Sequence, residues 1–310
     1  MKDRFGREID YLRISVTDLC NMRCRYCMPS QGVIKTEHEK ILSVEEIISA
    51  AKAASEIGIK KIRLTGGEPL VRKGIIKICE GIREAGCAKE LCMTTNGTLL
   101  PQYAKPLKQA GVDRLNISID TLNPEKYRYI TRTGELEDAL SGLDAARKAG
   151  FENTKINVVL IDGFNTDEIR TFAAFSQEQD VEVRFIELMP IGEAKSQKSF
   201  VSARNMISEL EDYKFAEIEG VASMFENGSS KIGFITPVSC EFCNTCNKLR
   251  LMADGHIRSC LYGEDGVCIK GYGREEMKEA FVSAVSQKPE SKGAFGDMAS
   301  DKRRMNMIGG

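Results

Sequence analysis

Short β-like runs alternate with helical patterns in this 310-residue chain, from its first strand to about Pro190. Connections of this kind join parallel strands through right-handed crossovers. Eight such units would close a full barrel, whereas six predict an α/β fold with a partial, open-sided (β/α)6 barrel of TIM type. The expected strands span residues 12–16, 61–65, 91–95, 114–119, 155–161 and 182–189.

The helices between these strands carry clear end signals. Ser43 and Glu46 have the spacing of a capping box, which predicts a helix over 44–57. A glycine just past a helix end favours the left-handed conformation that stops the helix, and Gly58, Gly86, Gly111 and Gly150 stand at such places. The other helices are expected at 74–85, 101–110, 135–149 and 166–179.

Polar and apolar side chains alternate along the strands with a period of two. Arg13 alternates with Leu12 and Ile14 in this way, and the same holds in three other strands. The apolar side must pack on the helices, so the polar side faces the lumen. Barrel lumens are normally filled by branched apolar residues; this one predicts a wet cavity for a polar, anionic ligand. An antiparallel sheet with one solvated face would alternate similarly, but the interleaved helices disfavour it.

The pattern changes after about Pro190. A polar loop at 192–200 is followed by a helical stretch at 202–210, short strands within 215–235 and a last helix at 274–287. We expect two regions, the barrel over 1–195 and a smaller C-terminal α+β domain over 196–310.

Composition narrows the class of protein. The net charge of −1 gives no global basic field, which argues against a nucleic-acid partner. No apolar run approaches a membrane span, and the charged N-terminus lacks the core of a signal peptide. Eleven cysteines in such a chain argue for metal binding or catalysis rather than disulfides. The expected location is cytoplasmic.

Three cysteines follow the first strand with the spacing C-x3-C-x2-C: Cys20, Cys24 and Cys27. A [4Fe–4S] cube has four irons, so three thiolates leave one iron open for chemistry. A structural zinc site needs four closed ligands, and the nearest histidine is the distant His38.

A second group lies late in the chain as C-x2-C-x13-C: Cys243, Cys246 and Cys260. Cys240 could be a fourth ligand, but we leave it out because it precedes the C-x2-C pair. Taken alone, this group fits zinc and iron–sulfur equally well. Buried, inert thiols are the expectation for Cys79, Cys87, Cys92 and Cys268.

These motifs together resemble the GTP 3′,8-cyclase family of radical S-adenosylmethionine (SAM) enzymes, which performs the first step of molybdenum-cofactor biosynthesis. The resemblance covers essentially the whole chain. It rests on both cysteine groups, Arg184–Met189, the terminal Gly309-Gly310 and the segments Gly66-Gly67-Glu68-Pro69, Thr94-Thr95-Asn96-Gly97 and Asn116-Ile117-Ser118-Ile119-Asp120.

The resemblance implies two [4Fe–4S] clusters with SAM as cofactor. Cys20, Cys24 and Cys27 would hold the SAM cluster, and Cys243, Cys246 and Cys260 the second, whose open iron would bind guanine. The SAM site would be lined by Tyr26, Gly67, Ser118 and Met189.

The implied substrate is GTP. A 5′-deoxyadenosyl radical would take its ribose 3′ hydrogen, and the carbon radical would attack C8 of guanine. Arg13, Gly309 and Gly310 would be catalytic, with the glycine tail reaching the active site. The expected substrate contacts are Arg13, Arg63, Thr94, Lys155, Lys248, Leu249 and Arg250. The family usually has arginine at the position of Lys248, so the grip on phosphate there is in doubt.

The implied partners are a cyclic pyranopterin monophosphate synthase downstream and a reductant such as flavodoxin, with a homodimer among the options. Two alternatives stay open. A radical SAM peptide-modifying enzyme could carry an auxiliary cluster, although that group tends to have a longer cysteine-rich domain. An iron–sulfur electron carrier would need fully ligated clusters and no polar lumen.

Overall fold

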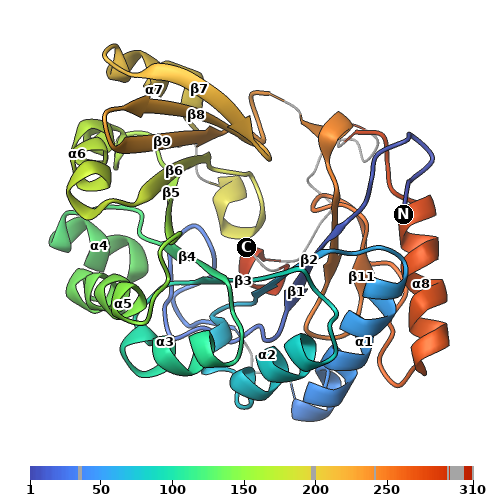
Figure 1. Ribbon diagram of the computed structural model, residues 1–310. Coiled ribbons are helices and arrows are strands. Elements are labelled where there is room, and N and C mark those ends of the chain that lie inside the picture. Colours follow the sequence, from blue (N-terminus) through green and yellow to red (C-terminus); the bar gives the residue numbers. More distant parts are fainter. Residues whose placement is uncertain (34–36, 197–199, 241, 292, 294–303, 309–310) are drawn as a thin grey trace.

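The structure, a computed structural model, describes residues 1–33, 37–196, 200–240, 242–291, 293 and 304–308. Its strands form one curled sheet in the order β11-β10-β1-β2-β3-β4-β5-β6-β9-β8-β7 (Figure 1). Neighbouring strands from β1 to β6 are parallel, which confirms the partial α/β barrel. These six strands are β1 (Tyr11–Ser15), β2 (Lys61–Thr65), β3 (Glu90–Thr95), β4 (Arg114–Ser118), β5 (Lys155–Leu160) and β6 (Glu182–Glu187).

Helices cover the outer side of the curled sheet (Figure 1). The capping box is confirmed, because Glu46 N donates to Ser43 Oγ at 3.1 Å and Ser43 N donates to Glu46 Oε2 at 2.8 Å. None of the helices in the described residues is long and apolar enough to cross a membrane. The helices are α1 (Val44–Glu56), α2 (Ile75–Glu84), α3 (Leu100–Gln109), α4 (Pro124–Thr131), α5 (Leu136–Lys148), α6 (Ile169–Gln179), α7 (Ala203–Ile207) and α8 (Arg274–Ser286).

The C-terminal strands extend the same sheet at both edges. β10 (Lys248–Leu251) pairs in parallel with β1, and the short β11 (Ile257–Arg258) runs antiparallel beside it. At the other edge β9 (Ser230–Ile235) pairs in parallel with β6, followed by antiparallel β8 (Ala222–Asn227) and β7 (Lys214–Glu219). The boundary near residue 195 stays a prediction from composition, since the hydrogen-bonded sheet runs across it.

The apolar core lies between the strands and the outer helices. The outward-facing side chains of the central strands have no exposed surface, for example Leu12, Leu64, Leu115, Ile156 and Phe185. The residues between them in sequence point to the inner side, as the alternation predicts. Leu249 of β10 follows the same rule: it is fully buried in the core, so its side chain faces away from the lumen.

Replacing the side chains at adjacent positions of β10 by alanine should therefore affect stability at one position and GTP binding at the other. Leu249→Ala leaves a cavity in the core and should lower the free energy of unfolding by about 2–5 kcal/mol, while the expected GTP ligand still binds. Lys248→Ala, the matched variant on the inner side, should weaken GTP binding and cost less stability. Denaturant unfolding and GTP titration measure the two effects. Loss of GTP affinity in stably folded Leu249→Ala would contradict this division of faces.

Candidate active site

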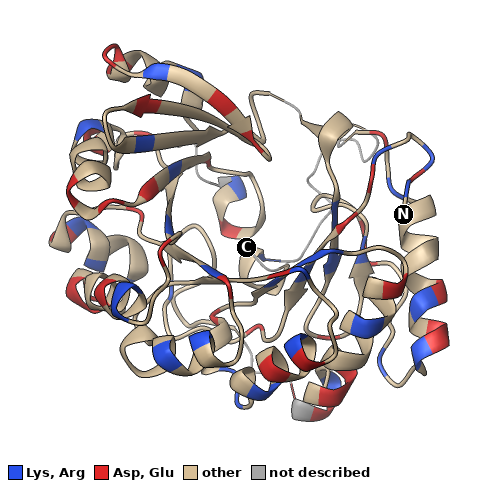
Figure 2. Cartoon of the chain, viewed as in Figure 1, with Lys and Arg blue, Asp and Glu red and all other residues tan. Residues whose placement is uncertain are grey.

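A row of arginines crosses the inner face of the sheet at one level. The parallel register sets Arg250 of β10 beside Arg13 of β1, and Arg13 beside Arg63 of β2. Cys92 of β3 comes next, followed by Arg114 of β4. Side chains paired across neighbouring strands lie close together on the same face. The row therefore concentrates positive charge in the lumen. Figure 2 marks the Lys and Arg positions of the chain in blue.

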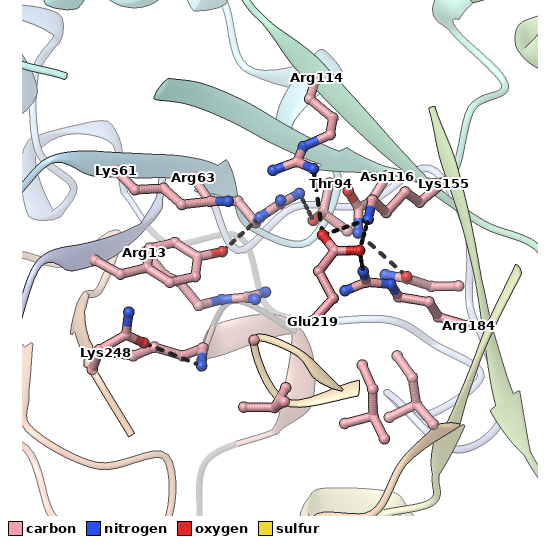
Figure 3. A pocket seen from close by; sticks show the side chains of 17 residues that line it. Arg13, Lys61, Arg63, Thr94, Arg114, Asn116, Lys155, Arg184, Glu219 and Lys248 are labelled. Carbon is pink, nitrogen blue, oxygen red and sulfur yellow. Dashed lines mark hydrogen bonds and ion pairs between the residues drawn. The ribbon is translucent and has the colours of Figure 1, made fainter. Parts of the chain in front are cut away.

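A cavity of about 300 Å³ opens onto this row (Figure 3). Among the described residues, its lining contains seven Lys or Arg side chains and one carboxylate, that of Glu219. Five of the predicted substrate contacts meet here: Arg13, Arg63, Thr94, Lys155 and Lys248. Leu249 is not among them, because its side chain is in the core. Arg250 lies deeper, where its guanidinium donates to the carbonyl oxygen of Ile308 at 2.9 Å.

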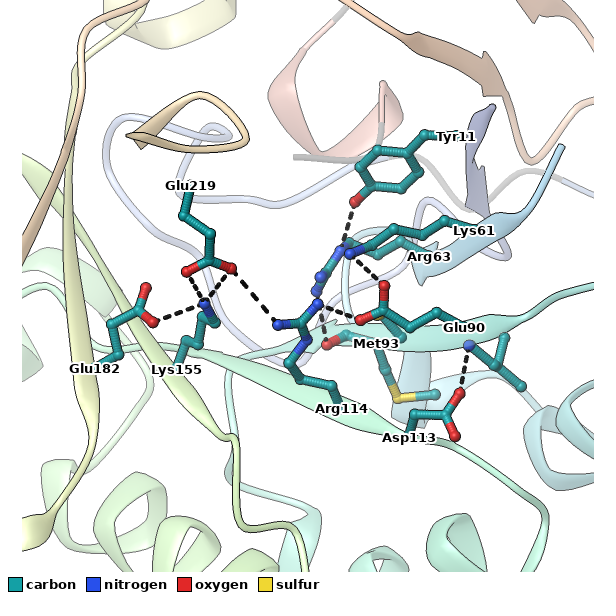
Figure 4. Close-up of polar contacts among 12 residues, drawn as sticks. Tyr11, Lys61, Arg63, Glu90, Met93, Asp113, Arg114, Lys155, Glu182 and Glu219 are labelled. Carbon is teal, nitrogen blue, oxygen red and sulfur yellow. Dashed lines mark hydrogen bonds and ion pairs between the residues drawn. The ribbon is translucent and has the colours of Figure 1, made fainter. Parts of the chain in front are cut away.

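On one side of the cavity, carboxylates hold the cations (Figure 4). The Lys155 ammonium donates to Glu182 at 2.7 Å and to Glu219 at 2.8 Å. The Arg184 guanidinium donates to Glu219 at 2.6 Å and also pairs with Glu182. Beside them, Lys61 and Arg114 share the carboxylate of Glu90.

Elsewhere in the cavity, the cations donate to uncharged acceptors. Arg63 Nε donates to the Tyr11 hydroxyl at 2.7 Å, and its Nη1 donates to Thr94 Oγ1 at 3.2 Å. Lys248 Nζ lies 3.4 Å from Asn247 Oδ1. Neutral partners satisfy hydrogen-bonding capacity but leave the charge in place, so this part of the cavity is suited to receive an anion.

Burial and the neighbouring positive charges lower the pKa values of Arg250 and Lys248. Burial, followed by the charge of Arg13, lowers the pKa of Arg250 to about 9. Burial also lowers the pKa of Lys248, and Arg13 and Arg250 push it in the same direction. A bound phosphate chain would relieve both effects by bringing negative charge to the row.

The first cysteine group lies at the carboxyl edge of the parallel strands, directly after β1. The end of α4 supports its loop, because Arg23 N donates to the Thr131 carbonyl at 3.0 Å and Arg25 N to the Ile130 carbonyl at 2.9 Å. Burial raises the pKa of Cys20 to about 11 and that of Cys27 to about 12. The charge of each thiolate further disfavours ionisation of its neighbours, so the group gathers thiols that a cationic centre would stabilise as thiolates.

Gly67 locks this loop to the end of β2. Gly67 N donates to the Thr17 carbonyl and Glu68 N to the Leu19 carbonyl, both at 2.8 Å. A Cβ at Gly67 would lie only 2.3 Å from the Leu19 carbonyl oxygen. The sequence interpretation assigned Gly67 to close approach of a ligand; the close approach seen here is to the cysteine loop itself.

The other predicted SAM residues lie at or beyond the same edge. Ser118 ends β4, and Met189 follows β6 and packs on the apolar cluster formed by Ile191, Met252 and Ile308. The Tyr26 hydroxyl donates to Asp120 Oδ2 at 2.7 Å, and burial raises the pKa of that carboxyl to about 6. Tyr26, Gly67, Ser118 and Met189 thus lie toward the edge of the sheet that carries the first cysteine group, and their contacts with SAM remain a prediction.

The second cysteine group lies at the opposite edge of the sheet. Cys243 and Cys246 precede β10, which runs parallel to β1, so they lie at the amino edge. Cys260 follows β11, which runs back to that edge. Charges of Cys260 and Cys246 act on Arg250, and those of Cys260 and Cys243 on Tyr262. The three thiols therefore share one neighbourhood, and the strands that line the cavity run from the edge of the second cysteine group to the edge of the first.

The donor set of each group is three thiols. Cysteine thiolates are the ligands of [4Fe–4S] clusters, whereas a structural zinc site takes four ligands. Each group of three therefore fits a cluster with one open iron.

The last described residues, 304–308, pack between these two groups. Asn306 is buried and its Nδ2 donates to the Asp18 carbonyl at 2.9 Å, beside the first cysteine loop. Ile308 is also buried and accepts the hydrogen bond from Arg250. The predicted catalytic residues Gly309 and Gly310 lie outside the described residues.

Two family profiles match successive parts of the chain. The radical SAM superfamily profile matches residues 14–176, and the profile named Molybdenum Cofactor Synthesis C matches residues 181–294. A GTP 3′,8-cyclase of Alkaliphilus oremlandii is 42% identical over 320 residues, covering 100% of each chain. One of Moorella thermoacetica is 46% identical over 303 residues, covering 93% of this chain and 94% of the relative.

The chain belongs to the GTP 3′,8-cyclase family of radical SAM enzymes. The cofactors of this family are SAM and [4Fe–4S] clusters, and the second cluster is typical of it. A crystal structure of Streptococcus suis SuiB bound to the precursor peptide SuiA has a TM-score of 0.67, covering 95% of this chain and 67% of SuiB. At 14% identity that likeness shows the fold alone.

Three further cations line the cavity of this cyclase-family chain: Lys61, Arg114 and Arg184. Sequence analysis did not select them, although the signal was present. Lys61 is two residues from Arg63 and Arg114 is two residues from Asn116, so each shares the face of its strand with a residue already predicted to face the lumen. Glu219 offered no such signal, because it comes from the hairpin beyond the predicted barrel.

Lys288, just past α8, also escaped sequence analysis. Its side chain is 2% exposed, and Nζ donates to the Lys248 carbonyl at 2.8 Å and to the Ser259 carbonyl at 2.5 Å. Burial raises the pKa of Cys246, but the charges of Lys288 and Lys248 and their hydrogen bonds together outweigh this effect, and the pKa is lowered. Lys288 thus joins the backbone that follows Cys246 to the backbone that precedes Cys260.

Replacing this lysine should disturb the second cysteine group selectively. In Lys288→Met we expect iron content after reconstitution to fall from about eight toward about four per chain. The unfolding free energy should fall by about 1–3 kcal/mol, because buried carbonyls lose their donor. Lys278→Met, at a partly exposed lysine of α8, is the control and should keep full iron content. Iron analysis and denaturant unfolding measure both effects; an unchanged Lys288→Met protein would contradict this role.

Proposed function

We propose that GTP binds in the cavity between the two cysteine groups, with its triphosphate on the arginine row. There the chain converts it to (8S)-3′,8-cyclo-7,8-dihydroguanosine 5′-triphosphate, the first step of molybdopterin biosynthesis. The row Arg250–Arg13–Arg63–Arg114 carries this proposal, because a tetraanionic ligand offsets the repulsion among these partly buried cations.

The two groups of cysteines would hold two clusters with different ligands. Cys20, Cys24 and Cys27 would hold the cluster that binds SAM, at the carboxyl edge. Cys243, Cys246 and Cys260 would hold the second cluster at the amino edge, where it meets guanine. When bound, SAM and its cluster supply the 5′-deoxyadenosyl radical that takes the ribose 3′ hydrogen.

The protein's own side chains then act by positioning. Arg13, Arg63, Thr94, Lys155 and Lys248 would hold the phosphates, while Arg250 connects the row to the tail through Ile308. Fixing the ribose between the two groups supplies the proximity that an intramolecular ring closure needs. The packed segment 304–308 helps to exclude water from one side.

Partners and location remain part of this proposal. The product would be passed to a cyclic pyranopterin monophosphate synthase, and a reductant such as flavodoxin would supply the electron. A homodimer is part of the same proposal. The cytoplasmic location is supported by the eleven cysteines, all of them free thiols in the structure, because thiols persist in reducing compartments.

The deciding experiment supplies GTP, SAM and dithionite to the reconstituted chain without oxygen. The wild type should form the 3′,8-cyclised nucleotide. Cys24→Ala should abolish SAM cleavage, whereas Cys246→Ala should retain some uncoupled cleavage but lose GTP binding, since the two cysteines serve different clusters. Chromatography of nucleotide and 5′-deoxyadenosine gives both readouts.

Two outcomes would count against this reading. SAM cleavage by the wild type without GTP consumption would favour the peptide-modifying alternative, which shares the fold of SuiB. Equal loss of SAM cleavage in the two cysteine variants would contradict the division between the groups.

Truncation tests the predicted role of the tail. Removing Gly309 and Gly310 should leave both clusters and SAM binding intact but reduce GTP cyclisation by about a hundredfold, the scale of an error in positioning. A short peptide ending in Gly-Gly should restore part of the activity, and one ending in Ala-Ala should not, because its Cβ atoms block a narrow crevice. Full activity of the truncated chain would show that the two glycines are dispensable.

A further inference from the structure

Glu219 is the one carboxylate among the described residues that line the cavity, and it comes from outside the predicted barrel. It is the last residue of β7, at the turn into β8. Its carboxylate lies 2.8 Å from Lys155 Nζ, 2.6 Å from Arg184 Nη2 and 3.7 Å from Arg114 Nη1. One acidic side chain thus contacts cations from three neighbouring strands (Figures 3 and 4).

This carboxylate lies on the open side of the cations that it contacts. The Glu219 side chain is 40% exposed, whereas those of Lys155 and Arg184 are 6% and 12% exposed. Burial raises the pKa of Glu219, but Lys155 and Arg184 outweigh this and lower it to about 2. The group is therefore an anion at physiological pH, placed between buried cations and the space that a ligand would enter.

The Lys155 ammonium cannot donate all its hydrogen bonds to an incoming phosphate while its contact with Glu219 persists. Its ammonium already donates to Glu182 and to both oxygens of Glu219. Glu182 belongs to β6 within the barrel, whereas Glu219 belongs to the hairpin. The hairpin carboxylate is the one that can leave without a change in the barrel.

The hairpin strand that carries Glu219 is weakly held at the edge of the sheet. β7 has a strand neighbour on one side only, and its pairing with β8 is irregular between Phe215 and Glu217. The turn after Glu219 begins with Gly220 at φ +64°, where an added Cβ would meet nothing within 4 Å. An edge hairpin with an open tip can separate locally at low cost compared with a central strand.

We propose that Glu219 is an internal anion that occupies the phosphate-binding cations in the substrate-free enzyme and is displaced by the nucleotide's phosphate chain. The inference rests on the proposed function, because it takes the cavity to be the triphosphate site. It adds a selection by charge. The cost of displacement is the same for every ligand, so a triphosphate, which makes the most phosphate contacts, offsets it, whereas a monophosphate makes too few contacts to do so.

Glu219→Gln tests this directly, since glutamine keeps the shape and loses the charge. Glu217→Gln, at an exposed position of the same strand, is the matched control. Inorganic triphosphate, GTP and GDP are titrated into the reconstituted enzyme by calorimetry. We expect Glu219→Gln to bind triphosphate and GTP at least about tenfold more tightly than wild type. GDP should gain by a similar factor, because loss of the carboxylate removes the same displacement cost for both nucleotides.

Stability supplies a second, opposite signature. Ligand-free Glu219→Gln should melt at a lower temperature than wild type, because Lys155 and Arg184 lose their counterion, and saturating GTP should remove most of the difference. Glu219→Asp, which keeps the charge on a shorter side chain, should bind GTP with intermediate affinity and provides the test if the glutamine variant fails to fold.

The outcomes separate the two levels of inference. If wild type binds GTP and triphosphate but Glu219→Gln binds them equally or more weakly, Glu219 is a structural or substrate-contacting residue and the displacement is overturned. If wild type binds neither ligand, the cavity is not the triphosphate site and both the displacement and the proposed function fail.

Discussion

Repulsion among three arginines on adjacent strands, Arg250 of β10, Arg13 of β1 and Arg63 of β2, is the constraint on which this structure depends. Like charges directly opposite one another destabilise a sheet, and partial burial strengthens the effect because water screens them less. The register fixes the row, since a slip by one residue would turn the arginines toward the helices and the apolar set toward the lumen. The apolar packing of Leu12, Leu64 and Leu115 on the outer helices therefore holds Arg13, Arg63 and Arg114 in place.

Strand direction alone then determines where the two cysteine groups stand. A loop after β1 must lie at the carboxyl edge, and a loop before the parallel strand β10 must lie at the amino edge. The charged row lies between them, so a ligand bound there faces one group at each end. The segment 304–308 contacts the first loop through Asn306 and the row through Ile308, which closes one side of the same space.

The repeating part of this architecture was readable from the sequence, and the long-range part was not. Six strands, the capping box at Ser43 and the polar lumen all follow from local periodicity. β10 has only four residues and pairs with a strand more than two hundred positions earlier, so no local pattern indicates it. The hairpin strands were expected, but their continuation of the barrel sheet depends on β9 pairing with β6. For the same reason Lys288 and Glu219, which reach the site from distant segments, carried no sequence signal.

Position 248, where the family resemblance leads us to expect arginine, carries a lysine in a crowded electrostatic setting. Its ammonium lies 5.6 Å from the centre of the Tyr11 ring. Burial lowers the pKa of Lys248, and the charges of Arg13 and Arg250 act in the same direction. A lysine brings one compact charge to the cavity and lacks the planar fork of a guanidinium. Position 248 therefore offers phosphate a point charge, whereas bidentate geometry is left to the arginines of the row.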